Sequence, residues 1–186
     1  MPARTVGPVR VVGAGLLGAS IGLALRGLGV DVLLDDASPS ALALAVDYGA
    51  GRAQDDTVPA LVVVAVPPDL VADVVACELE RWPDALVTDT ASVKAPPLQR
   101  LVERGADVAR YVGSHPMAGR ERSGPIAARA DLFLGRPWVV APHAGTAFDA
   151  FMVVENLAAD TGAVPVRLAA DEHDLAVGLV SHAPHV

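Results

Sequence analysis

A run of apolar residues followed directly by three closely spaced glycines constrains this fold more than any other feature of the sequence. Residues 9–12 have the pattern of a buried strand, Gly13, Gly15 and Gly18 come next, and residues 16–28 have a helical pattern. The first glycine permits a tight turn, the second lets a ligand approach the backbone, and the third lets the helix pack closely on the strand. The segment therefore predicts a strand, a turn and a helix that begin an α/β sheet.

Short apolar strands alternate with helical segments along the rest of the chain. Ser38 and Pro39 suit the N-cap and first residue of a helix, and Gly49 suits its end. The sequence predicts strands at residues 9–12, 31–35, 61–66, 85–88, 108–112, 137–141 and 163–167, and helices at 16–28, 39–48, 69–81, 97–104 and 146–161. Continuous apolar strands that alternate with helices indicate a sheet covered on both faces. We therefore expect the α/β class, with a doubly wound, mostly parallel sheet and right-handed crossovers.

The last residues have a different pattern. Asp171 suits a helix N-cap, with Asp174 three positions later, and a helical pattern continues to residue 186. The pattern stops without a capping glycine or a basic last turn. We expect residues 1–168 to form one domain, and residues 169–186 to be the first helix of a truncated helical domain.

Composition and charge exclude several classes of protein. With 52% hydrophobic and 19% charged residues, the 186-residue chain is not intrinsically disordered. Its 22 acidic and 14 basic residues give a net charge of -8, which disfavours nucleic acid and anionic membranes as partners because both repel it. A single cysteine, Cys77, excludes an internal disulfide and agrees with a reducing compartment. We therefore expect a cytoplasmic protein.

The glycine-rich turn has the spacing of a dinucleotide-binding site. Free N–H groups and the positive dipole end at the N-terminus of the following helix suit phosphates. In the context of a preceding strand and a following helix, the motif is typical of the Rossmann type of sheet. We assign the phosphates of the cofactor to this turn and helix start, namely to Gly13, Gly15, Leu16, Leu17 and Gly18.

Asp36, at the end of the second predicted strand, indicates which dinucleotide is bound. Its carboxylate suits both hydroxyls of the adenosine ribose and repels a 2′-phosphate, and neither Ala37 nor Ser38 is basic. NAD is therefore preferred to NADP. Asp35 remains an alternative for the ribose, because alternation at a strand end does not settle which side chain points inward. A plain tight connection, or a site for FAD or another nucleotide, are alternatives for the whole motif.

Val66 and Pro67 end the third long strand, where the ribose and phosphates border such a sheet. We assign both residues to the cofactor site. A plain strand terminus is an equal alternative for this tract.

Three clusters of reactive residue types follow the cofactor half, at residues 89–94, residues 113–121, and His173-Asp174 with residues 181–185. The first two follow strand ends, where open parallel sheets bind ligands. With the glycine-rich turn, these clusters resemble the prephenate and arogenate dehydrogenase family of tyrosine biosynthesis. The matching motifs are Gly13-x-Gly15-Leu16-Leu17-Gly18-x-Ser20, Ser92-Val93-Lys94, Gly113-Ser114-His115-Pro116-Met117-Ala118-Gly119, Leu132-Phe133-x-Gly135-Arg136-Pro137-Trp138, His173-Asp174 and Ser181-His182-x-Pro184-His185.

The resemblance implies NAD-dependent oxidative decarboxylation of prephenate to 4-hydroxyphenylpyruvate, or of arogenate to tyrosine. His115 matches the catalytic histidine of the family, and an imidazole with an ordinary pKa of ~6.5 suits the substrate's hydroxyl proton. Ser92 matches its hydrogen-bonding serine, and Glu121, Ser181 and His185 match residues of the substrate pocket. The resemblance also implies a homodimer through a later helical domain, and little activity for this chain alone.

Two residues near the implied site have simpler interpretations. Ser92 equally suits a cap for the helix that begins near Pro96. Lys94 suits a surface ion pair with Asp89, and we leave it out of the catalytic set.

Other interpretations of the whole chain follow from the same residues. His182 and His185 are spaced i, i+3, but no cysteine or correctly spaced carboxylate completes a ligand set, so we expect no metal. A β-hydroxyacid dehydrogenase is a second hypothesis, although those enzymes use a lysine where this chain has histidines. A non-catalytic NAD-sensing module is a third. Arg120, where relatives often have a small hydroxyl residue, leaves both prephenate and arogenate open.

Overall fold

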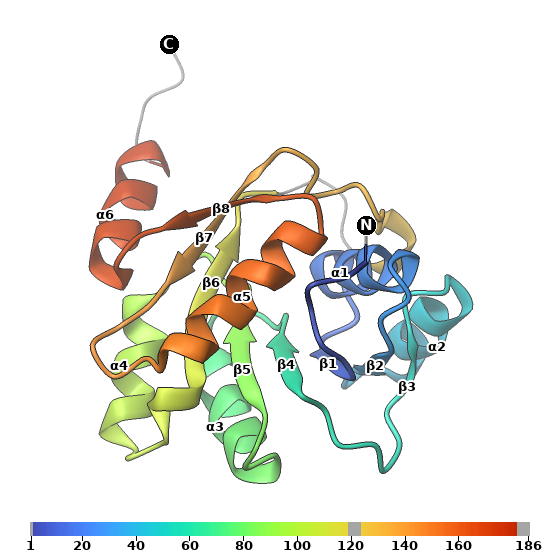
Figure 1. The fold of residues 1–186 in the computed structure, drawn as a ribbon, viewed down its shortest axis with the longest axis horizontal. Coiled ribbons are helices and arrows are strands. Elements are labelled where there is room, and N and C mark those ends of the chain that lie inside the picture. The colour runs from blue at the N-terminus through green and yellow to red at the C-terminus, as the bar shows by residue number, and fades with distance from the viewer. Residues whose placement is uncertain (1, 119–123, 182–186) are drawn as a thin grey trace.

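The computed structural model describes residues 2–118 and 124–181, which form one mixed sheet with helices on both faces (Figure 1). The strand order within these residues is β3-β2-β1-β4-β5-β6-β7-β8. Neighbouring strands are parallel except for β6 and β7, which are antiparallel. The strands are β1 (Val9–Val12), β2 (Val32–Asp35), β3 (Arg52–Ala53), β4 (Leu61–Val64), β5 (Leu86–Asp89), β6 (Tyr111–Pro116), β7 (Pro137–Ala141) and β8 (Val164–Arg167).

Two groups of helices cover the two faces of this sheet. The helices are α1 (Leu16–Gly27), α2 (Pro39–Asp47), α3 (Val71–Arg81), α4 (Ala95–Glu103), α5 (Phe148–Asp160) and α6 (Ala170–Ser181). Side chains alternate along each strand, so Val63 faces α1 and α5 in one core cluster, while Val62 and Val64 face α3 and α4 in the other. Among the described residues, no helix combines the length and apolar character needed to cross a membrane.

The chain changes direction of winding at β1. From β1 it proceeds outward through β2 to β3, and it then returns to place β4 on the other side of β1. The loops that leave the carboxyl ends of β1 and β4 therefore diverge, which opens a crevice at this end of the sheet. The predicted glycine-rich turn lies directly at this switch point, after Val12.

The predicted α/β, doubly wound, mostly parallel sheet is confirmed, with differences at several elements. The strand expected at residues 61–66 ends at Val64, and the strand expected at residues 108–112 extends to Pro116, so His115 lies within it and not after its end. The latter strand begins at Tyr111, after a 3-10 turn at Val108–Arg110, and β3 was not predicted because it has only two residues. β6 and β7 are antiparallel, a pairing that needs no crossover helix, and the only helical element among the described residues 117–118 and 124–136 between them is a 3-10 turn at Pro125–Ala127.

The start of α6 differs from the prediction. The helix begins at Ala170, and Glu172 accepts a hydrogen bond from the N–H of Ala169 (3.2 Å), so Asp171 lies inside the first turn and is not the N-cap. The helix contacts α4 and β7 and lies at the opposite end of the molecule from α2 (Figure 1). The domain division at residue 168 stays a prediction.

Candidate active site

The glycines of the turn have three different structural roles. Gly13 has φ +99°, and a Cβ there would lie 2.4 Å from the carbonyl oxygen of Ala65. A Cβ at Gly18 would lie 1.9 Å from the carbonyl oxygen of Gly13, so the close helix–strand packing requires glycine. At Gly15 a Cβ would meet no atom within 4 Å, because this position faces the crevice. The middle glycine therefore leaves room for a ligand against the backbone.

The N-terminus of α1 offers unpaired backbone donors beside the turn. The first hydrogen bond of the helix runs from Ala19 N–H to the Gly15 carbonyl (2.9 Å). The N–H groups of Leu16, Leu17 and Gly18 consequently have no acceptor within the helix. The Leu16 and Leu17 side chains are partly buried against the core, and their backbone N–H groups are the donors available to a ligand. This arrangement suits a phosphate group.

A cavity of about 620 Å³ extends from the turn along the carboxyl ends of β1, β2 and β4. Its volume is in the range of sites for small molecules and cofactors. Val66 and Pro67 both line it, as we expected of cofactor-binding residues. The complete lining comprises Val12, Gly13, Gly15, Asp35, Asp36, Ala37, Ala65, Val66, Pro67, Leu70, Asp73, Val74, Cys77 and Glu78.

Asp35 and Asp36 have different partners in this cavity. Asp35 binds the buried guanidinium of Arg10 (2.6 Å), which also binds Glu78 (2.8 Å). Asp36 accepts hydrogen bonds from the N–H groups of Ala14 and Ser38, both at 2.7 Å. A carboxylate has about four acceptor sites, so both side chains retain capacity for hydroxyls. The assignment of the ribose to Asp36 stays a prediction.

His115 lies near the carboxyl end of β6 and forms a hydrogen-bonded row with two residues of α6. Its Nδ1 is 2.9 Å from Nε2 of His173, and Nδ1 of His173 is 2.8 Å from a carboxylate oxygen of Asp174. Burial lowers the pKa of His115 to about 4, and electrostatic contributions from His173 and Lys94 act in the same direction. The expected ordinary pKa is therefore wrong, because the site withdraws the imidazole from water.

Lys94 pairs with Asp89, as expected, but the pair is buried and not on the surface. The two side chains are 1% and 0% exposed. The Lys94 ammonium also donates to the Ser114 carbonyl (2.7 Å), and the Tyr111 hydroxyl donates to the second oxygen of Asp89 (2.7 Å). Burial lowers the pKa of Lys94, while the charge of Asp89 opposes this shift. The pair joins the ends of β5 and β6 beside His115.

Ser92 lies exposed in the loop after β5. The alternative in which it caps the following helix is wrong, because α4 begins at Ala95 and Asp174 accepts from the N–H groups of Lys94 (2.8 Å) and Ala95 (2.9 Å). The Ser92 side chain has no hydrogen bond to His115 in the part of the chain that the structure describes. Its catalytic role stays a prediction.

Three predicted substrate residues fall outside what the structure describes. Glu121 and His185 lie outside the described residues, and Ser181 ends α6 without a described side chain. Among the residues from 2 to 118 and 124 to 181, no group of three His, Cys, Asp or Glu side chains could hold a metal ion.

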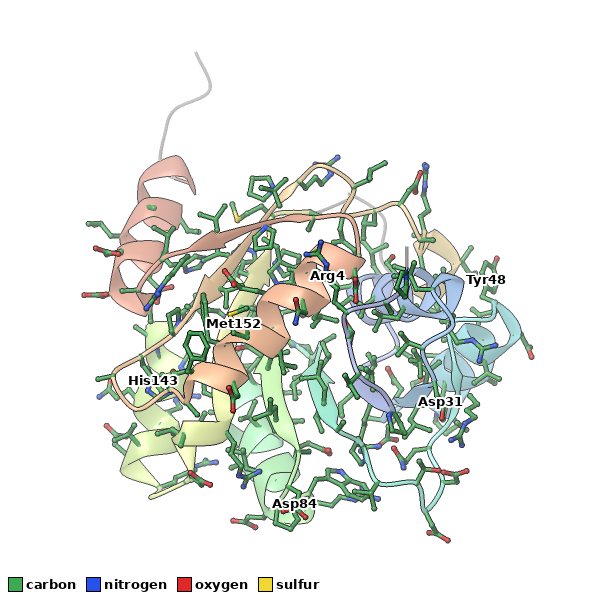
Figure 2. The ribbon with its side chains drawn as sticks, viewed as in Figure 1. Arg4, Asp31, Tyr48, Asp84, His143 and Met152 are labelled. Carbon is green, nitrogen blue, oxygen red and sulfur yellow. The ribbon has the colours of Figure 1, made fainter. Side chains whose placement is uncertain are left out.

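His143 and His173 show how differently two histidines are used. His143 lies at the turn before α5, with Nε2 3.1 Å from the Val108 carbonyl, and it fixes this turn (Figure 2). The sequence showed the dipeptide His173-Asp174 as part of a cluster of reactive residue types but indicated no separate role for it. No local signal could have paired it with His115, which is 58 positions away.

A doubly wound sheet with a glycine-rich turn and a cavity at its switch point defines a Rossmann-type nucleotide-binding domain. The family profile described as "Prephenate dehydrogenase, nucleotide-binding domain" matches residues 21–167. The chain belongs to this family.

Relatives of known name agree with this assignment. The chain is 46% identical over 178 residues to the probable prephenate dehydrogenase NovF of Streptomyces niveus, covering 95% of this chain and 49% of that protein. Prephenate dehydrogenase from Aquifex aeolicus, solved in complex with hydroxyphenyl propionate and NAD+, matches with a TM-score of 0.85 at 29% identity, covering 95% of this chain and 65% of that one. Synechocystis arogenate dehydrogenase matches with a TM-score of 0.84 at 26% identity, covering 94% and 64%. The chain thus spans about half the length of its Streptomyces relative.

Proposed function

We propose that this chain supplies the NAD-binding part and the catalytic histidine of a prephenate or arogenate dehydrogenase. The observation that carries the proposal is His115, which is held neutral near the strand end of a sheet whose switch point carries a dinucleotide cavity. The Aquifex relative, solved with NAD+ and a hydroxyphenyl ligand, supports the choice of cofactor and substrate class. The Synechocystis relative supports arogenate as the alternative substrate.

The residues around the cavity suit NAD. The open position at Gly15 and the unpaired N–H groups of α1 would hold the pyrophosphate, and Asp36 would hold the adenosine ribose. Val66 and Pro67 would border the nucleotide at the end of β4. When bound, NAD supplies the acceptor for a hydride.

The role of His115 follows from the chemistry of a cyclohexadienol that carries a carboxylate opposite its hydroxyl. As the carbinol carbon loses hydride, the bond to the carboxylate breaks, carbon dioxide leaves, and the bonding electrons complete an aromatic ring. A neutral imidazole at His115 accepts the hydrogen bond of the hydroxyl while positive charge develops on its oxygen. The product phenol retains the proton, so His115 stabilises the charge without a net proton change.

The remaining assignments rest on the family resemblance. Ser92 would hydrogen-bond to the hydroxyl or to the imidazole, and Glu121, Ser181 and His185 would line the substrate pocket. We also propose a homodimer in the cytoplasm, supported by the acidic charge and the single cysteine for the compartment and by the resemblance for the dimer.

Titration calorimetry of the 186-residue chain tests the cofactor assignment. NAD should bind more tightly than NADP, because Asp36 accepts the ribose hydroxyls and repels a 2′-phosphate. Asp36→Ala should weaken NAD binding by about 1.5–3 kcal/mol, the usual contribution of a hydrogen bond to a charged group, and should narrow the preference.

Asp56→Ala, which removes an exposed carboxylate elsewhere, serves as the control for net charge. Equal or tighter binding of NADP by the unchanged protein would contradict the assignment.

Reduction of NAD to NADH in the presence of prephenate or arogenate, measured with the longest natural form of the protein, tests the reaction. Tight NAD binding without turnover of either substrate would favour the NAD-sensing alternative.

A further inference from the structure

In the row His115–His173–Asp174, a hydrogen bond of 2.9 Å connects His115 of β6 to His173 of α6, and one of 2.8 Å joins His173 to Asp174 within α6. The His173 side chain, at its centre, is 1% exposed. Asp174 is fixed independently, since its two oxygens accept the N–H groups of Lys94 and Ala95 at the start of α4. The row is therefore anchored at its far end by the backbone of a third element, and it leads to the proposed catalytic imidazole.

The chemistry of the three groups determines where the protons lie. Although partial burial acts to raise it, hydrogen bonds from Ala95 and His173 hold the pKa of Asp174 below its ordinary value, so the group is a carboxylate. A carboxylate only accepts, and Nδ1 of His173 must donate to it. In a neutral imidazole the other nitrogen is then an acceptor, so Nε2 of His173 accepts a hydrogen bond from the N–H at Nδ1 of His115. This leaves the lone pair of His115 on Nε2.

We propose that His173 and Asp174 are positioning residues that fix His115 as the Nδ1–H tautomer, with Nε2 free to accept the substrate hydroxyl. The proposal rests on the proposed function, because it gives His115 the acceptor atom which that reaction requires. It also explains why α6 lies against the sheet at this point. The dipeptide His173-Asp174 bonds to both the catalytic strand and the start of α4.

The charged groups that face His115 agree with a neutral imidazole in this row. Lys94 comes from the loop before α4, and His173 and Asp174 come from α6. The Lys94 ammonium is directed to Asp89 and to the Ser114 carbonyl, and neither of its partners is the imidazole. Protonating His115 would place a second cation beside this buried ammonium. The neutral form therefore persists, and only its tautomer remains to be set by His173.

Nitrogen NMR of the 186-residue chain, with ¹⁵N-labelled histidine at neutral pH, tests the tautomer without any need for activity. Long-range couplings between the ring nitrogens and carbon-bound protons distinguish the two tautomers in each of the five histidines. The His115 signals are assigned by their loss in His115→Gln. We expect the Nδ1–H form at His115 and also at His173. An Nε2–H form at His115 in the unchanged protein would overturn the proposal.

Two substitutions at His173 separate positioning from simple packing. The amide oxygen of His173→Gln can still accept from His115, whereas His173→Leu fills the space without an acceptor. The Leu variant should lose the Nδ1–H signal of His115, and the Gln variant should keep it. If the Nδ1–H signal of His115 persisted in both variants, the assignment of His173 as the group that fixes the tautomer would be overturned.

Steady-state kinetics of the longest natural form complete the test. His173→Leu should lower kcat by about 10–100-fold with little change in KM, a part of the ~10²–10⁴-fold that a positioned base contributes. His173→Gln should recover most of this loss. Equal losses of kcat in both variants would overturn the positioning role. If the unchanged enzyme turned over neither substrate, the proposed function would fail, and the NMR result would still decide the tautomer.

Discussion

Three neighbouring groups influence the pKa of His115, namely His173, Lys94 and Asp174. Burial, with smaller electrostatic contributions from His173 and Lys94, lowers its pKa to about 4, whereas a histidine in water titrates near ~6.5. Residue type alone identified a candidate proton acceptor. The surroundings then decide the range of pH in which it can act, because only the neutral imidazole has a lone pair to offer.

In the longest natural form of the enzyme, His115→Asn should lower kcat by ~10²–10⁴-fold with little change in KM, because the hydrogen bond matters most as charge develops. In the unchanged enzyme, kcat should fall as the pH drops through about 4, because the His115 imidazole gains a proton below its pKa of about 4 and can no longer accept a hydrogen bond. His143→Asn, which alters a histidine bonded to the Val108 carbonyl and not to a member of the row, controls for the loss of a histidine. A near-normal kcat for His115→Asn would contradict the role of His115 as the hydrogen-bond acceptor of the substrate hydroxyl.

Helix α1 illustrates how packing at the scale of one element depends on the absence of side chains. Gly18 lies against the turn, and a Cβ at Gly22 would lie 2.2 Å from the carbonyl oxygen of Ala50. Gly27, at the end of the same helix, has no neighbour within 4 Å of such a Cβ. The two inner glycines thus let α1 approach the backbone closely, whereas Gly27 has no comparable contact.

Gly22→Ala should lower the free energy of unfolding by about 1–3 kcal/mol, because α1 and the segment at Ala50 must move apart to make room for the added Cβ. Gly27→Ala should raise it by about 0.4–1 kcal/mol, since alanine restricts the unfolded chain and favours the helix. Urea denaturation followed by circular dichroism measures both. A stabilised Gly22→Ala protein would show that the close approach is not required.

At the scale of the whole molecule, two buried charged clusters join the strands beneath the site. Arg10 of β1 binds Glu78 of α3 and Asp35 of β2, so three elements around the dinucleotide cavity share one guanidinium. Lys94 and Asp89 connect the ends of β5 and β6. Figure 2 also shows Arg4 beside α5, where its backbone N–H donates to the carboxylate of Asp160 (2.8 Å) and ties the N-terminal segment to the end of this helix.

Arg10→Met should lower the free energy of unfolding by about 3–5 kcal/mol, because it leaves Glu78 buried without its cation. The matched control is Arg52→Met. Arg52 also binds two carboxylates, Asp31 and Asp55, but the pairs are exposed, and the midpoint of denaturation should change little. Similar losses of unfolding free energy in the two variants would indicate that burial does not determine how much the Arg10 cluster contributes to stability.

Features that depend on neighbours along the chain could be predicted from the sequence alone. The strand–turn–helix at residues 9–28 and the N-cap at Ser38 involve residues a few positions apart, whose conformational preferences are local. The doubly wound class followed from the alternation of apolar strands and helices, and the family resemblance pointed to His115.

Only the tertiary structure decided which distant groups share a proton or a charge. Asp174 caps α4 from 80 positions away, and His173 reaches His115 across 58. The Lys94–Asp89 pair was expected from the sequence, but its burial was not, since burial depends on strands that pack around it. Local preference cannot encode such contacts, because they exist only after the sheet has brought the ends of β5, β6 and α6 together. The tertiary structure, and not the local sequence, therefore determines the pKa of His115 and its proposed tautomer.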